Sequence, residues 1–171
     1  DYTICYYDKR LKNTHAHQLA ASLIFYSPLQ TIFWYDRPSF YQGEPEIEWF
    51  EHLQTVFDDS KVLSGEPGKG IVMARRKGEE WFVAAMTNNE GSQQTVDLSF
   101  LDKGKPYLAY IYTDGGEEVK TRTHVRCTYL LVDASQRLYF TLQPRGGAAI
   151  RLVPATGEET GKYKKYRKNM N

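Results

Sequence analysis

The feature of this sequence that most limits its fold is a change in the spacing of apolar residues near Asp58. Before this point apolar side chains recur at the helical spacing of about 3.6 residues, and after it they alternate with polar ones. Turn sequences such as GEPGKG, RKGEE and DGGEE then interrupt the chain about every ten residues. Short strands separated by such turns are typical of an antiparallel sandwich or barrel. The pattern therefore predicts a mainly β domain that follows a helical region.

The region after Asp58 contains about eight strand-like segments, enough for one two-layer domain. They are residues 61–63, 71–76, 81–87, 95–98, 107–113, 125–132, 138–142 and 148–152. In the third segment Trp81, Val83 and Ala85 fall on one face, because alternate side chains of a strand point to the same side. We therefore expect Trp81 to lie in the core of an antiparallel β-sandwich.

The region before the strands shows two helical patterns. Residues 14–26 (THAHQLAASLIFY) contain no Gly or Pro and carry apolar residues at helical spacing, which predicts a mostly buried helix. Either Asn13 or Thr14 can cap its start. The Ser-Pro sequence that follows ends it, since Pro28 disfavours a helical conformation in the residue before it. After an aromatic-rich segment that we expect to be irregular, residues 44–57 predict a second, amphipathic helix.

Acidic residues crowd the start of this second helix, where the helix dipole favours them. We expect these side chains to be solvated: Glu44, Glu46, Glu48 and Glu51. No pattern in the sequence places two carboxyl groups together in a pocket, as general acid and base catalysis requires. His15 and His17 are two residues apart and point to different sides of a helix, so they predict no metal pair.

Charge and cysteine content argue against several classes of partner. The 22 basic and 21 acidic side chains give a formal net charge of +1, so we expect no nucleic-acid partner. No apolar run approaches the roughly 20 residues of a membrane-spanning helix. Cys5 and Cys127 stand far apart without zinc spacing, and we expect two unpaired thiols. Residues 155–171 are basic and poor in apolar side chains, and we expect a solvated tail that extends beyond the domain.

Several short motifs follow one another along the chain in a fixed order. They are Asp1-Tyr2-Thr3, His17-Gln18-Leu19-Ala20, Phe25-Tyr26-Ser27-Pro28-Leu29-Gln30, the D-x-P-x-x-Y pattern of Asp36, Pro38 and Tyr41, Asp58-Asp59-Ser60-Lys61-Val62-Leu63, Ala74-Arg75-Arg76-Lys77-Gly78, Trp81-Phe82-Val83, Met86-Thr87-Asn88, and Gly146-Gly147 with Ala149-Ile150-Arg151. As an ordered set they resemble the C-terminal portion of glycoside hydrolase family 97. Three features depart from the family pattern. Ile4 stands where Pro is frequent, and Phe57 where Trp is usual. The stretch between Gln30 and Asp36, which carries Phe33-Trp34-Tyr35, is roughly two residues longer than is usual in the resembled family.

The resemblance implies a division of the chain into three parts. Residues 1–57 are the C-terminal remnant of a catalytic (β/α)8 barrel with a connecting helix, residues 58–154 form a β-sandwich C-terminal domain, and residues 155–171 form a basic tail. In the resembled family the catalytic carboxylates and a calcium ion belong to the barrel and the domain before it. The resemblance therefore implies no catalytic residue and no metal ligand in this chain, and an inactive fragment when it stands alone.

The same resemblance implies the function of a longer protein. That protein is expected to be a glycoside hydrolase that cleaves α-glucosidic or α-galactosidic bonds of an oligosaccharide, with calcium, in the periplasm or outside the cell. The partner of this chain is then the missing catalytic barrel of the same polypeptide, and the sandwich is a structural accessory domain.

A second interpretation is a self-standing carbohydrate-binding or protein-interaction module. It rests on the aromatic-rich segment, whose flat rings can stack on sugars. Trp34 and Tyr35 are its candidate carbohydrate contacts. The same rings can instead join the helical region to the sandwich by packing against both. Exposed rings favour binding, whereas buried rings favour the structural role.

Overall fold

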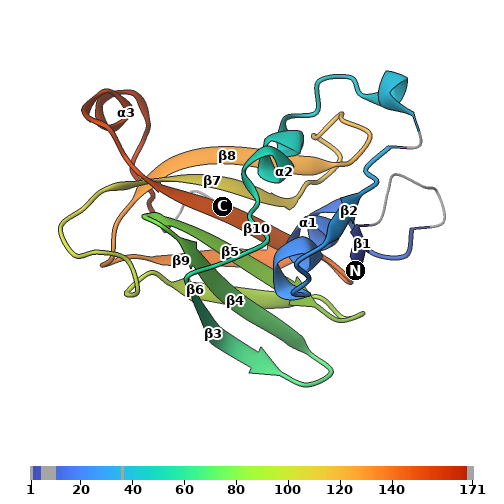
Figure 1. The fold of residues 1–171 in the computed structure, drawn as a ribbon, viewed down its shortest axis with the longest axis horizontal. Coiled ribbons are helices and arrows are strands. Elements are labelled where there is room, and N and C mark those ends of the chain that lie inside the picture. The colour runs from blue at the N-terminus through green and yellow to red at the C-terminus, as the bar shows by residue number, and fades with distance from the viewer. Residues whose placement is uncertain (1, 5–10, 36, 169–171) are drawn as a thin grey trace.

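A six-stranded antiparallel sheet lies at the centre of the structure, a computed structural model that describes residues 2–4, 11–35 and 37–168 (Figure 1). In spatial order its strands are β3 (Asp59–Glu66), β4 (Gly70–Lys77), β5 (Glu80–Thr87), β10 (Gly147–Pro154), β7 (Tyr107–Asp114) and β8 (Val125–Val132). A second, two-stranded antiparallel sheet consists of β6 (Ser92–Asp97) and β9 (Arg137–Leu142). These strands confirm the predicted mainly β fold, and all eight overlap the predicted segments.

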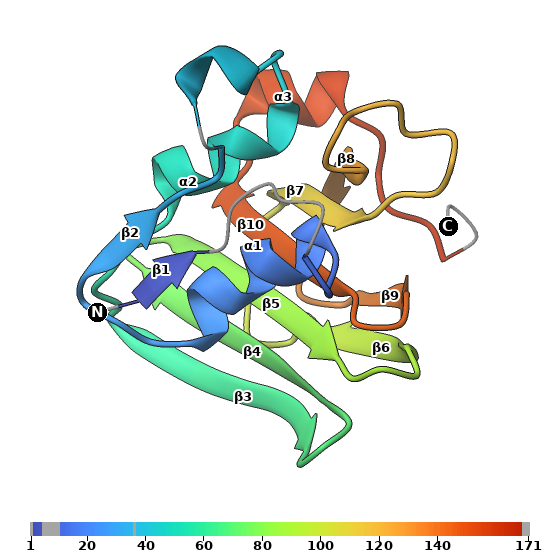
Figure 2. The same ribbon diagram turned by 90° about the vertical axis from the view of Figure 1, so that its right-hand side faces the viewer.

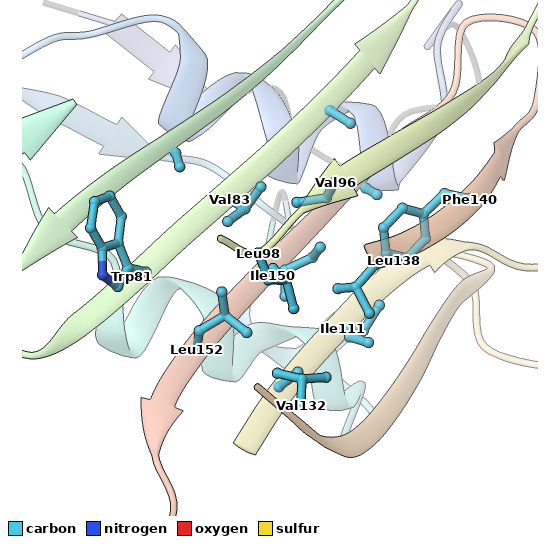
Figure 3. Packing of buried hydrophobic residues seen from close by; sticks show 14 of the residues in the cluster. Trp81, Val83, Val96, Leu98, Ile111, Val132, Leu138, Phe140, Ile150 and Leu152 are labelled. Carbon is cyan, nitrogen blue, oxygen red and sulfur yellow. The ribbon is translucent and has the colours of Figure 1, made fainter. Parts of the chain in front are cut away.

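The two antiparallel sheets enclose the main hydrophobic core (Figure 3). On β5 the side chains of Trp81, Val83 and Ala85 point into this core and are only 5%, 0% and 2% exposed. Val96 on β6 and Leu138 on β9 close the core from the smaller sheet. The placement of Trp81 predicted from the alternation is therefore confirmed.

Helices cover the other face of the six-stranded sheet, so its central strands are buried on both faces. A second apolar cluster joins Phe82 and Ala84 of β5 to Leu19 and Leu23 of α1 (His15–Ile24). The result is three layers, with helices, a large sheet and a small sheet (Figure 2). Burial on both faces accounts for the nearly continuous apolar run WFVAAM on β5, where a half-exposed strand would alternate.

Helix α1 is mostly buried, as its sequence predicts. Its cap is Thr14, not Asn13, because the Thr14 hydroxyl accepts a hydrogen bond from the His17 backbone N–H at 3.1 Å. The helix lies directly on β10. A Cβ atom at Gly147 would stand 2.6 Å from the His17 Cα, so the close contact of helix and strand requires glycine there.

The segment that we expected to be irregular begins with a short strand. β2 (Gln30–Ile32) pairs in parallel with β1 (Tyr2–Ile4), and α1 connects the two. Two parallel strands joined by a helix form a βαβ unit. Three residues are too few to show a periodicity, which explains why the sequence did not reveal the strand. A 3₁₀ turn, η1 (Pro38–Phe40), follows β2 along the chain.

The second helix is shorter than the predicted residues 44–57. A 3₁₀ turn, η2 (Pro45–Ile47), leads into α2 (Glu48–His52). The tighter turn changes which side chains face inward. Trp49 of α2 is completely buried, and its indole N–H donates to the Ser22 hydroxyl at 2.9 Å.

The described part of the tail packs back onto the sandwich, contrary to our expectation. After α3 (Gly157–Lys162) the chain returns to β8, where the Tyr166 N–H donates to the Leu131 carbonyl and the Leu131 N–H donates to the Lys164 carbonyl, both at 2.9 Å. Tyr166 is 8% exposed and belongs to the main core. The Gln136 side-chain amide and the Tyr139 backbone N–H also donate hydrogen bonds to Tyr166, so the segment docks despite its polar composition. It also covers part of the outer edge of β8.

Candidate functional site

Polar side chains from separate segments meet where the helical region joins the sandwich. His15 begins α1, Trp34 follows β2, Glu44 and Glu46 belong to the turn at η2, and Thr123 lies in the loop between β7 and β8. The His15 ring contacts Trp34, and Glu46 lies near Trp34 and Thr123. We call these five residues the junction cluster.

The acidic residues near η2 are not the solvated helix start that we expected. Glu44 is 3% exposed and Glu46 is 0% exposed, because the 3₁₀ turn directs both side chains inward. Glu48 is half-buried, and its carboxylate accepts a hydrogen bond from the Tyr112 hydroxyl. Of the four acids only Glu51 is exposed.

The environment of Glu46 favours its protonated form. Burial raises its pKa, and the nearby Glu44 carboxylate adds to the shift. The Thr123 hydroxyl and the Trp34 indole lie near the carboxyl group and act to lower the pKa. Neither carboxyl oxygen of Glu46 nevertheless reaches hydrogen-bond geometry with a described residue.

The environment of Glu44 favours its ionised form. Burial acts to raise its pKa, but hydrogen bonds to the carboxylate bring the pKa below its ordinary value. The Gln42 backbone N–H donates to this carboxylate at 2.8 Å, and the nearby Tyr35 hydroxyl also acts to lower the pKa. Two neighbouring carboxyls whose pKa values move apart are typical of general acid and base pairs. Glu46, however, has no exposed surface for a substrate to reach, so the pair is not an active site in this conformation.

The histidine of the cluster is neutral at physiological pH. Burial lowers the pKa of His15 to about 4, and the charge of His124 lowers it further, while a hydrogen bond with the Thr123 backbone opposes the shift. The neutral ring packs edge-on against Trp34, with the ring centroids 5.5 Å apart.

The two candidate carbohydrate contacts lie in different surroundings. Trp34 is 3% exposed and packs edge-on against Phe50, at 5.1 Å between ring centroids, as well as against His15. Tyr35 is half-buried, and its ring lies 6.3 Å from that of Tyr41. Burial of Trp34 fits the packing role. The carbohydrate contacts of Trp34 and Tyr35 remain predictions.

A second contact joins the same segment to the sandwich. The Phe40 ring has the Arg37 guanidinium at 6.0 Å and the Arg122 guanidinium at 5.8 Å. Arg122 comes from the loop between β7 and β8. Sequence reasoning missed Arg122, Thr123 and the burial of Glu46, because nothing local in the sequence marks contacts between such distant segments.

Two surface cavities of the described structure are lined by acidic side chains that the sequence analysis did not single out. Glu79 and Glu80 both line one hollow of about 490 Å³. Glu80 is held by Arg151 in two hydrogen bonds of 2.8 and 3.0 Å, and Glu79 by Lys105 at 2.8 Å. Both carboxylates are therefore engaged by cationic side chains. A cavity of about 610 Å³ at the start of β7 has Asp133 as its only acidic lining residue.

The described residues do not fit a calcium site. Among them, no group of three or more His, Cys, Asp and Glu side chains is placed to hold a metal ion. Cys127 is a free, half-buried thiol, and burial raises its pKa to about 12. Cys5 and Asp36 lie outside the described residues. No helix within the described ranges is long and apolar enough to cross a membrane.

The fold is that of a β-sandwich domain that carries a βαβ unit. Comparison with known families agrees with this class. A family described as "Glycosyl-hydrolase 97 C-terminal, oligomerisation" matches residues 56–153. The chain therefore belongs to glycoside hydrolase family 97, as a C-terminal region.

Individual relatives are much longer than this chain. A retaining alpha-galactosidase of Bacteroides thetaiotaomicron is 35% identical over 153 residues, which are 89% of this chain and 23% of the relative. A probable retaining alpha-galactosidase of Streptomyces bingchenggensis is 27% identical over 101 residues, or 58% of this chain and 15% of the relative. A family 97 enzyme of Pseudoalteromonas, solved with acarbose, aligns with a TM-score of 0.74 at 31% identity over 84% of this chain and 23% of its own.

Proposed function

We propose that this chain is the C-terminal part of a larger glycoside hydrolase and that its sandwich supports a catalytic (β/α)8 barrel in the same polypeptide. One observation carries the proposal. The βαβ unit leaves large apolar side chains in solvent at the end of α1 and around β2. Their exposed fractions are 50% for Phe25, 58% for Tyr26, 63% for Leu29 and 46% for Ile32.

Such a unit is incomplete by itself. Parallel sheets in proteins are covered on both faces and rarely consist of two strands. Soluble monomers also rarely expose contiguous apolar patches of this kind. Further parallel strands and helices of a barrel would pair with β1 and β2 and cover these side chains.

The sandwich supports the barrel by sharing α1 with it. Leu19 and Leu23 of α1 pack on the six-stranded sheet, and the Arg75 guanidinium of β4 donates to the Leu23 carbonyl at 3.0 Å. Cations at the C-terminal end of a helix are stabilising. Loss of the sandwich would leave this helix uncovered on its apolar side.

The substrate of the whole enzyme is an oligosaccharide with α-galactosidic or α-glucosidic bonds. The names of the curated relatives support the first, and complexes of similar Pseudoalteromonas enzymes with acarbose and with panose support the second. Calcium bound by residues outside this chain, and a periplasmic or secreted location, belong to the same proposal and rest on the family resemblance.

The proposal is tested by comparing the full-length enzyme that contains this sequence with the 171-residue chain alone. Release of p-nitrophenol from its α-galactoside and α-glucoside is the measurement. We expect turnover by the full-length enzyme and none by the chain. Turnover by the chain that is lost in Glu80→Gln would contradict the proposal. Tight oligosaccharide binding by the isolated chain would favour the self-standing binding module.

A deletion measures the supporting role directly. Full-length enzyme that lacks residues 58–171 is expected to melt at a lower temperature than the intact enzyme, because the apolar side of α1 becomes exposed. An unchanged melting temperature would show that the barrel does not need the sandwich.

A further inference from the structure

The orientation of the βαβ unit shows where the segment after β2 lies. β1 and β2 pair in parallel register, with Tyr2 opposite Gln30 and Ile4 opposite Ile32. The carboxyl ends of the two strands therefore lie at the same edge. Residues 33–35 and 37–41, which we call the aromatic segment, leave β2 at that edge and run away from the strand ends (Figure 2).

Carboxyl ends of parallel strands are the positions where α/β proteins bind their ligands. This holds for (β/α)8 barrels and also for open parallel sheets. We propose that the aromatic segment forms part of the oligosaccharide-binding cleft of the full-length enzyme and contacts sugar rings of the substrate. This inference rests on the proposed function.

The side chains of the aromatic segment suit a sugar ligand. Phe33 is 42% exposed and Tyr41 is 49% exposed, so both present ring surface to solvent. Flat aromatic rings stack on the apolar faces of sugars. Arg37 is exposed next to Phe40, and its guanidinium group carries several N–H donors suited to sugar hydroxyls.

The helical region and the sandwich both hold this segment in place. Trp34 is buried between His15 and Phe50, and the Arg122 guanidinium of the β7–β8 loop stacks on Phe40. The β7–β8 loop comes from the family-matched region, whereas the aromatic segment belongs to the βαβ side. Trp34 and Arg122 are therefore positioning residues, and Phe33 and Tyr41 are substrate-contacting residues. The accessory domain thus shapes the substrate cleft in addition to stabilising the barrel.

The opposite end of β2 offers a matched control. Tyr26 is 58% exposed and precedes β2, at the amino ends of the strands. The amino-terminal face of a parallel barrel contributes to stability and does not bind substrate. Tyr26→Ala and Tyr41→Ala thus remove the same side chain from opposite ends of one strand.

The test uses the full-length enzyme and a natural oligosaccharide, with kcat and KM measured separately. We expect Tyr41→Ala to raise KM about fivefold to tenfold with kcat within about twofold, since removal of uniform binding acts on KM alone. Tyr26→Ala is expected to leave KM unchanged. Arg122→Ala is expected to raise KM by a smaller factor, whereas Arg137→Ala, an exposed arginine on β9 that pairs with Asp97, is expected to leave it unchanged.

Each outcome decides between the proposals. Wild-type KM in both Tyr41→Ala and a Phe33→Ala,Tyr41→Ala double variant, with activity intact, overturns the inference and leaves the proposed function standing. Equal rises of KM in Tyr26→Ala and Tyr41→Ala also overturn it, because the effect is then not specific to the carboxyl ends. A full-length protein without glycosidase activity overturns the proposed function itself.

Discussion

Trp34 is the buried ring that joins the aromatic segment to helices α1 and α2. It is 3% exposed, and its ring edges contact His15 at 5.5 Å and Phe50 at 5.1 Å. We expect Trp34→Ala to destabilise the chain and to loosen the aromatic segment, because the substitution removes the contact that fixes this segment below its exposed rings.

The size of the effect follows from burial. A buried indole hides about 150–250 Å² of surface. At about 25 cal/mol per Å² this contributes roughly 4–6 kcal/mol. The Trp34 Nε1–H reaches no acceptor in hydrogen-bond geometry among the described residues, and a buried unsatisfied donor costs roughly 1–3 kcal/mol. The expected loss is therefore about 3 kcal/mol, at the lower end of the range of about 3–5 kcal/mol for Trp→Ala in cores.

Urea denaturation of the 171-residue chain measures this loss, and a thermal scan gives a second value. For a chain of this size about 3 kcal/mol corresponds to a melting temperature lower by roughly 6–12 °C. Trp34→Phe is the matched control, since it keeps a ring and removes the unpaired donor, and we expect it to cost less than half as much. A loss below about 1 kcal/mol for Trp34→Ala, as at surface positions, would refute the packing role.

Four further predictions concern other side chains. Burial raises the pKa of Glu46 in the folded state above its ordinary 4.5, so the wild-type protein loses stability as pH rises above that value. The free energy of unfolding of Glu46→Gln should therefore grow relative to that of the wild type from pH 4.5 upward, by at most about 1.4 kcal/mol per pH unit. A difference in urea denaturation that does not depend on pH would contradict this. Burial lowers the pKa of His15 in the folded state to about 4, so the protein should lose stability as pH falls from 6.5 toward that value. His15→Gln should abolish this loss. Trp81→Ala should lower the free energy of unfolding by about 3–5 kcal/mol, whereas a loss under about 1 kcal/mol would place the ring outside the core. Tyr166→Ala should speed tryptic cleavage of the tail several-fold relative to Tyr163→Ala, as followed by mass spectrometry, and equal rates would show that the buried ring does not hold the tail.

The sequence by itself determined the class of the domain and the approximate strands. Alternation of apolar and polar residues places Trp81 in the core without any tertiary information, because the two-residue repeat of a strand is a local property. The cap and length of α1 are also local, and the structure confirms the helix within two residues at each end. The ordered short motifs were sufficient for the family, although no single motif was.

Only the tertiary structure decided what the residues between the helices do. The sequence predicts a solvated side chain for Glu46, but the structure buries it completely. Its neighbours are Thr123, which is remote in sequence, and Trp34, which is separated from it by turns. The docking of Tyr166 and the parallel pairing of β2 were hidden for the same reason. Periodicity reports on which face of one element is apolar, whereas burial, pKa and register depend on which elements meet, and that is a property of the whole fold.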